Sequence, residues 1–93
     1  MKSLDEIKDI YDICKTTERL DVKEFSAFAN KILHHLYDDK TYLLYEELGV
    51  VPFNYWEAII IGNIAPSTYT QSVIFSKVKE IVIRRYFICS KSK

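Results

Sequence analysis

Two adjacent histidines and two adjacent aspartates have a spacing that could bind a metal ion. His34 and His35 stand four residues before Asp38 and Asp39, so on a helix each histidine shares a face with one carboxylate. Such a pair supplies only two ligands, which is too few for a zinc site. We therefore expect no metal site, and we interpret the histidines as exposed imidazoles that the C-terminal end of a helix dipole stabilises.

Groups suited to acid–base or nucleophilic catalysis are present, but their arrangement does not fit catalysis. The sequence contains no nucleophile elbow and no glycine-rich loop that could cradle a phosphate. Adjacent acids, as in Asp38–Asp39 and Glu46–Glu47, point in different directions from a helix and form an exposed acidic face. The sequence therefore predicts a protein that is not an enzyme, with no catalytic residues and no cofactor.

Tyrosines and acids gather in the middle of the chain. Tyrosine offers a large contact area at a low entropic cost, and carboxylates steer basic partners towards a surface. This composition is similar to that of small helical immunity proteins that block basic nuclease toxins, and to anti-sigma and antirepressor proteins. One hypothesis is therefore a protein-binding inhibitor of a basic partner; the alternative for each tyrosine is a place in the core. The candidate surface consists of Tyr37, Asp38, Asp39, Tyr42, Tyr45, Glu46 and Glu47.

The elements that must position these residues are helices. Apolar residues recur at helical spacing, strict alternation is rare, and there are only two glycines and two prolines. Asp21, with Glu24 three residues later, forms a capping box for the second helix. The sequence predicts one all-α domain over residues 1–93 with about five short helices. The expected helices are residues 4–15, a second helix capped by Asp21 and ending near residues 37–39, then 40–48, 52–61 and about 70–88, with a strand as the alternative at 81–83.

A glycine between two apolar helical patterns is the most informative feature of the chain. Leu48 precedes Gly49 and Val50 follows it. Glycine readily takes a positive φ, so the chain can turn sharply there while the two apolar neighbours fill the corner between helices. The pattern predicts a helix-turn-helix over residues 40–61, a unit that many DNA-binding proteins use.

This motif resembles Cro/repressor-type helix-turn-helix domains over about residues 25–85. Tyr55 and Ala58 fall where the second motif helix should face inward. Gly62, followed by Ala, Pro and Ser at residues 65–67, resembles the glycine and the Pro-Ser pair that usually follow the recognition helix in this family. The resemblance implies a small DNA-binding transcription regulator. Three departures stand against it. Tyr45 replaces the usual alanine, the interval between the glycines is one residue longer, and the second motif helix has no lysine or arginine.

The residues expected to contact duplex DNA come from the starts of the two motif helices. Backbone N–H groups and the helix dipole favour a phosphate near Lys40 and Thr41, and Asn54 is the residue of the second motif helix best suited to reading a base. Trp56 completes the set, with a position in the core as its alternative. The outward face of the second motif helix is expected to consist of Val51, Phe53, Asn54, Trp56, Glu57 and Ile60, and later basic residues are Lys77, Lys79, Arg84 and Arg85.

Charge is unevenly distributed although the net charge is zero. Residues 1–57 hold 12 acidic and seven basic residues, a balance of −5, whereas residues 58–93 hold one acidic and six basic residues, a balance of +5. Such asymmetry indicates a charged partner, DNA or protein, or halves that neutralise each other within the fold or across a dimer. A homodimer would suit a DNA reader, and Val82 and Phe87 are its candidate contacts.

The sequence also predicts where the protein works. Residues 1–6 become acidic at once and lack an apolar run, so we expect no signal peptide. The apolar run 58–61 is too short to span a membrane. We therefore expect a cytoplasmic protein without a membrane partner. Cys14 and Cys89 are expected to be reduced, and a disulfide between the two ends of the chain is the alternative.

Overall fold

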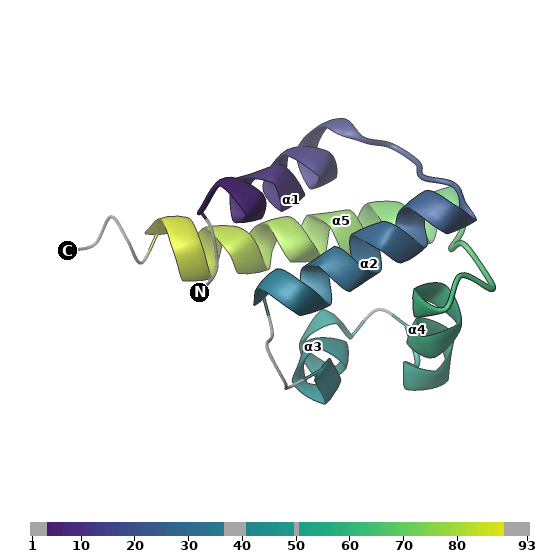
Figure 1. The fold of residues 1–93 in the computed structure, drawn as a ribbon. Helices are drawn as coiled ribbons and strands as arrows, with labels where there is room; N and C mark the ends of the chain where they lie inside the picture. Colours follow the sequence, from purple (N-terminus) through teal and green to yellow (C-terminus); the bar gives the residue numbers. More distant parts are fainter. Residues whose placement is uncertain (1–3, 37–40, 50, 89–93) are drawn as a thin grey trace.

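The described residues of the computed structural model, 4–36, 41–49 and 51–88, form helices joined by short connections (Figure 1). No strand occurs among them, so the predicted all-α fold is confirmed. The helices are α1 (Leu4–Thr16), α2 (Val22–Leu36), α3 (Thr41–Leu48), α4 (Phe53–Ile60) and α5 (Thr68–Val82), which continues into the π-helix η1 (Ile83–Ile88).

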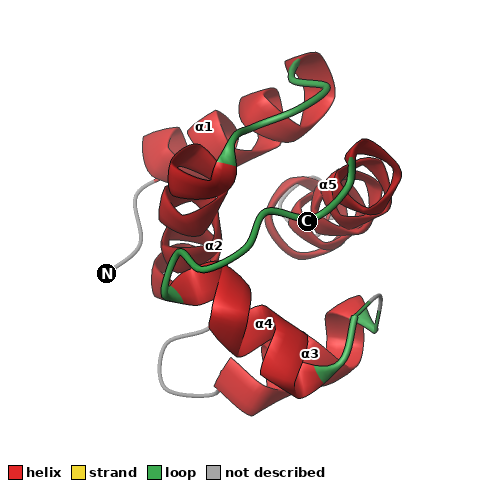
Figure 2. Cartoon of the chain, turned by 90° about the vertical axis from the view of Figure 1, so that its right-hand side faces the viewer, coloured by secondary structure: helices red, strands yellow, loops and turns green. Residues whose placement is uncertain are grey.

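The helices α1, α2 and α5 enclose the main core. Figure 2, which looks along α5, shows these three helices around a common centre, with α3 and α4 on the far side of α2 from α1. Phe25 and Phe28 of α2 meet Phe75 of α5 there, at ring-centroid distances of 5.8 and 5.4 Å. Aromatic rings of this size bury the most apolar area per residue and dominate core energetics. The other buried residues of these helices include Ile7, Ile10, Cys14, Ala29, Ile32, Leu36, Ile74, Val78, Ile81 and Val82.

Side-chain caps fix where α2 and α5 begin. The Glu24 backbone N–H donates to the Asp21 carboxylate at 2.8 Å, and the Asp21 N–H donates to the Glu24 carboxylate at 3.2 Å. This confirms the predicted capping box. Ser67 caps α5 by accepting from the backbone N–H of Thr70 at 3.2 Å.

The C-terminal helix corrects one alternative from the sequence. A strand over residues 81–83 is wrong, because Ile81 and Val82 are the last buried residues of α5 and Ile83 begins the π-helix. The β-branched residues that suggested a strand face the core at helical spacing, so tertiary burial outweighs their strand preference. The chain beyond residue 88 lies outside the described residues.

A buried glutamine joins the two long connections of the fold. Gln71 is fully buried in α5. Its Oε1 accepts from the Leu20 N–H at 2.8 Å, and its Nε2 donates to the carbonyls of Leu20 at 2.9 Å and Pro66 at 3.0 Å. The α1–α2 and α4–α5 connections are thereby held together at one end of the molecule.

Candidate functional site

Two short helices joined by a tight turn form the part of the fold that the sequence singled out. α3 ends at buried Leu48, and the Gly49 N–H donates to the Tyr45 carbonyl at 3.0 Å. Gly49 has φ of 58°, the left-handed region that favours glycine. Pro52 lies one residue before α4 and its carbonyl accepts from the Trp56 N–H at 3.1 Å. The turn at Gly49 is therefore where the sequence predicted it.

The inward face of α4 differs from the expected one. Trp56 is 1% exposed and Ile59 is fully buried, whereas Tyr55 and Ala58 are only half-buried. An outward Trp56 is wrong, and the core position given as its alternative is the one observed, while Tyr55 packs at the margin of the core. Trp56, Ile59 and Ile60 form a wider apolar stripe at i, i+3 and i+4, and turning the tryptophan inward removes the largest apolar area from water.

Tyr45 accounts for the way in which α3 and α4 meet. Its ring packs edge-on against Phe53 with centroids 4.7 Å apart, and lies 5.9 Å from the ring of Trp56. A residue larger than the alanine of repressor-type motifs therefore occupies the contact between the helices. Among the described residues, the buried indole Nε1 of Trp56 has no hydrogen-bond partner, so packing holds this side chain in place.

The outer face of this helix pair is acidic and apolar. Glu46, Asn54 and Glu57 are exposed, Phe53 is 52% exposed and Ile61 is 69% exposed. No lysine or arginine occurs from Thr41 to Ser76. We call Glu46, Phe53, Asn54 and Glu57 the α3–α4 face. A surface of this composition can desolvate against a protein and attract basic groups, but it repels phosphates.

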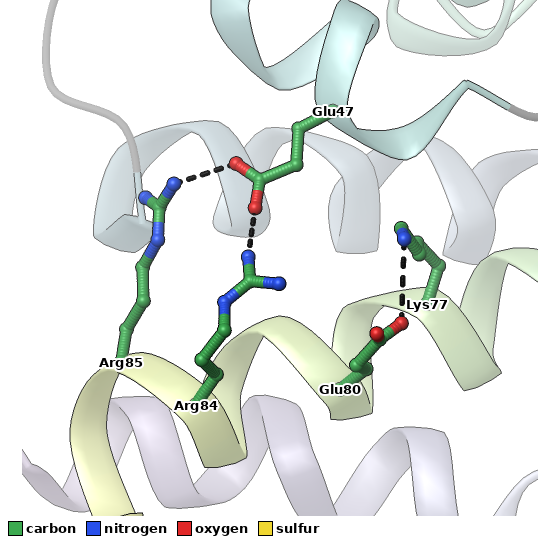
Figure 3. A network of polar contacts seen from close by, with 5 residues as sticks. All are labelled: Glu47, Lys77, Glu80, Arg84 and Arg85. Carbon is green, nitrogen blue, oxygen red and sulfur yellow. Dashed lines mark hydrogen bonds and ion pairs between the residues drawn. The ribbon is translucent and has the colours of Figure 1, made fainter. Parts of the chain in front are cut away.

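Glu47 points away from the α3–α4 face and forms ion pairs with the C-terminal helix. Figure 3 shows one carboxylate oxygen directed at Arg84 and the other at Arg85, which lies 2.6 Å away. Both arginines belong to η1, so the pairs join α3 to a segment nearly 40 positions later in the chain. Nearby, Lys77 pairs with Glu80 at 3.3 Å. Part of the opposite charge of the two halves is thus neutralised inside the molecule.

Of the four residues expected to contact DNA, only Asn54 and Trp56 have described side chains. Trp56 is in the core and cannot reach a duplex, so its place in the set is wrong. Asn54 is exposed near the start of α4. Thr41 is the first residue of α3, but its side chain, like the whole of Lys40, lies outside the described residues.

The tyrosine-rich acidic surface is described only in part. Tyr45 is half-buried against α4, Glu46 is exposed and Glu47 is paired with arginines. The side chain of Tyr42 lies outside the described residues, as do Tyr37, Asp38 and Asp39. Sequence reasoning missed the Glu47 pairs, although the opposite charges of the two halves were the signal for them.

The histidines lie at the end of α2, where His34 is exposed as expected and His35 is half-buried. His35 Nε2 lies 2.7 Å from the Glu6 carboxylate, its carbonyl accepts from the Tyr86 hydroxyl at 3.4 Å, and the His34 ring lies beside it. The side chain of His35 is only 17% exposed, so it is not the exposed imidazole that the sequence suggested. Within the described part of the chain, no three histidine, cysteine or acidic side chains gather as metal ligands.

The residues expected at a dimer contact belong to the core or its margin. Val82 is fully buried, so it cannot form a contact between two copies of this fold. Phe87 is half-buried, and its ring packs edge-on against Tyr11 with centroids 5.6 Å apart. Val82 is therefore wrong as a dimer contact, because its side chain completes the packing between α5 and the rest of the core.

Cys14 is a free thiol inside the core, and Cys89 lies outside the described residues. Burial raises the pKa of Cys14 from 9.0 to about 12, and the nearby Lys79 ammonium opposes part of that rise. A thiol in this state is protonated at neutral pH and is a poor nucleophile.

Neither a membrane-spanning helix in the described ranges nor a match to a known protein adds to the description of this chain. Among the described residues, none of the helices is both long and apolar enough to cross a membrane. Comparisons of the chain with protein-family models, with curated proteins and with solved structures gave no match.

Proposed function

We propose that this protein is a non-enzymatic binding module that captures a basic protein partner through the α3–α4 face. The observation that carries the proposal is the composition of that face: exposed Phe53 lies one helical turn before exposed Glu57 on α4, Glu46 is exposed on α3, and no lysine or arginine occurs from Thr41 to Ser76. Inhibitors of basic proteins, such as toxin-immunity, anti-sigma or antirepressor proteins, are the class that fits.

Each exposed side chain has a separate part in the proposed complex. Phe53 supplies an apolar anchor that loses little entropy on binding. Glu46 and Glu57 attract lysines and arginines of the partner and raise the association rate. Asn54 adds hydrogen bonds at the rim. Glu47 contributes less, because Arg84 and Arg85 already neutralise its charge.

DNA binding is the second candidate, and a specific observation favours it. The positive φ of Gly49 joins two short helices in the manner of a helix-turn-helix, and Asn54 is exposed at the start of the second helix. A transcription regulator would use Asn54 to read a base and Lys40 to contact a phosphate. The acids of the α3–α4 face oppose this role, because DNA affinity depends mainly on basic residues that neutralise phosphates.

Capture from a lysate of the native host tests the protein-binding proposal. The immobilised protein should retain a basic protein, and Phe53→Ala should reduce capture chiefly by raising the dissociation rate. Glu46→Gln should lower the association rate, and this loss should shrink at high salt. Glu47→Gln is the matched control, since the same chemical change at the neighbouring residue removes a charge that is already paired.

A duplex titration in parallel distinguishes the two candidates. At about 50 mM salt, where phosphate contacts are strong, we expect no duplex binding. Duplex binding that Lys40→Ala weakens for every sequence and Asn54→Ala weakens at one base position would replace the protein-binding proposal with the DNA-binding one. Equal capture by wild type, Phe53→Ala and Glu46→Gln would also overturn the protein-binding proposal.

A further inference from the structure

Two lysines that have no ion-pair partner in the described part of the chain line one cavity beside α1. The cavity has a volume of about 380 Å³ and is bounded by the C-terminal end of α1, the segment that follows it and α5. Lys15 comes from α1 and Lys79 from α5. Figure 1 shows α1 on one side of α2 and α5, with α3 and α4 on the other. The cavity is therefore separate from the α3–α4 face.

One face of α5 directs hydroxyl groups at this cavity. Thr68, Ser72 and Ser76 are exposed, line the cavity and recur every four residues, and Lys79 continues the same face. The opposite face of α5 is buried in the core, so α5 cannot rotate to present other side chains. A helix face of hydroxyls next to a lysine supplies donors for several oxygens of one anion.

Two buried residues form part of the cavity wall, next to Lys79. Cys14 and Phe75 are both buried and line the cavity. The Lys79 ammonium is close enough to the Cys14 thiol to act on it electrostatically. Lys79 is also only partly exposed. Two unpaired cations with few competing anions favour the binding of an anion there.

We infer that this cavity binds a small hydroxylated phosphate ester. Lys15 and Lys79 pair with the phosphate, and the hydroxyls of α5 donate to its remaining oxygens. A phosphate suits this donor set better than a carboxylate, because its three terminal oxygens can accept from more of the groups present. Glu18 also lines the cavity and accepts from a hydroxyl of the ligand. Small-molecule sites have volumes of about 300–1,000 Å³, so the cavity fits a metabolite and not a polymer.

The test is a titration of the whole chain followed by the backbone amide signals in NMR spectra. Glycerol 3-phosphate should shift the signals of Thr68, Ser72, Ser76 and Lys79, with a dissociation constant of about 1 mM or tighter. Inorganic phosphate should shift the same signals more weakly, and neutral glycerol should shift none. No saturable shift by glycerol 3-phosphate at about 10 mM would overturn the inference.

Matched variants show whether the cavity is responsible. Lys79→Gln removes the positive charge while leaving a polar side chain, and it should weaken glycerol 3-phosphate binding by at least about tenfold. Lys23→Gln removes an exposed lysine of α2 away from the cavity and should leave binding unchanged. Equal losses in both variants would mean non-specific attraction and would overturn the inference.

Glu18→Gln separates recognition of the ester from recognition of phosphate alone. Removal of the carboxylate should strengthen binding of inorganic phosphate and reduce the preference for glycerol 3-phosphate. An unchanged preference would contradict the role given to Glu18. These measurements do not depend on the protein partner, so the two proposals can fail separately.

Discussion

Gln71 is the polar residue on which the packing of α5 depends most directly. Its side chain is fully buried and satisfies three backbone groups, the N–H and carbonyl of Leu20 and the carbonyl of Pro66. These groups belong to two connections that are distant in sequence, and the Pro66 carbonyl is buried while those of Leu20 are partly buried. An unpaired buried polar group costs more than the net gain of making its hydrogen bond.

We therefore expect Gln71→Leu, which keeps a similar volume, to lower the free energy of unfolding by more than about 2 kcal/mol. Urea denaturation followed by far-UV circular dichroism measures the change. Ser72→Ala at the exposed neighbouring position should change stability by no more than about 0.5 kcal/mol. A Gln71→Leu protein as stable as the wild type would show that these hydrogen bonds contribute little.

The contribution of Cys14 to stability depends on pH. Burial raises its pKa from 9.0 to about 12, so the folded protein holds the thiol proton more tightly than the unfolded chain does. The resulting contribution to stability is fully present below pH 9 and is lost as the pH rises from 9 towards 12. Alkylation at pH 9 in a Cys89→Ser background should be at least about 100-fold slower in the folded state than in urea. Equal rates would show that the thiol is accessible.

At the scale of the elements, the turn at Gly49 decides how α3 and α4 pack. A Cβ at this position would lie 3.5 Å from the Glu46 carbonyl oxygen, which is ordinary contact. Steric contact therefore does not prevent a larger residue at position 49. The backbone conformation disfavours other residues there, because residues with a side chain rarely adopt a φ of 58°.

Gly49→Val should therefore destabilise the fold by more than about 1 kcal/mol. Gly49→Asn should cost less, since asparagine tolerates the left-handed region better than other residues with a side chain. Thermal unfolding of the two variants provides the comparison. If valine and asparagine lower the melting temperature equally, the backbone conformation is not the cause.

At the scale of the whole molecule, Glu47 links the helix pair to the C-terminal helix. Its carboxylate lies between Arg84 and Arg85, whose side chains are 51% and 39% exposed. Water and salt screen pairs of this exposure, so their contribution to stability is modest. The two pairs connect α3 with η1, and they direct the Glu47 carboxylate away from the α3–α4 face.

Glu47→Gln should lower the free energy of unfolding by about 1 kcal/mol or less, with a smaller effect at high salt. A double-mutant cycle with Arg85→Gln should give a favourable coupling energy for the pair. Glu46→Gln, one residue earlier and exposed, should leave stability unchanged. Zero coupling between Glu47 and Arg85 would mean that their contact does not tie the two elements together in solution.

The sequence by itself determined the local structure of this protein. The helix start at Asp21 follows from a side chain that caps a nearby backbone N–H group, and the turn at Gly49 follows from the left-handed conformation that glycine accepts. Apolar residues at helical spacing predicted the all-α fold. Each of these features depends on interactions within a few residues, so the sequence contains the necessary information.

Only the tertiary structure decided which side of α4 faces the core and which charged side chains form ion pairs within the fold. The spacing of apolar residues in α4 is compatible with more than one buried face. In the folded protein, the buried face is the one that contains Trp56 and Ile59. The pairing of Glu47 with η1 and the bonds of Gln71 join residues far apart in the chain. Such contacts depend on how the helices pack, and side-chain burial against distant elements outweighs the local pattern that a sequence can show.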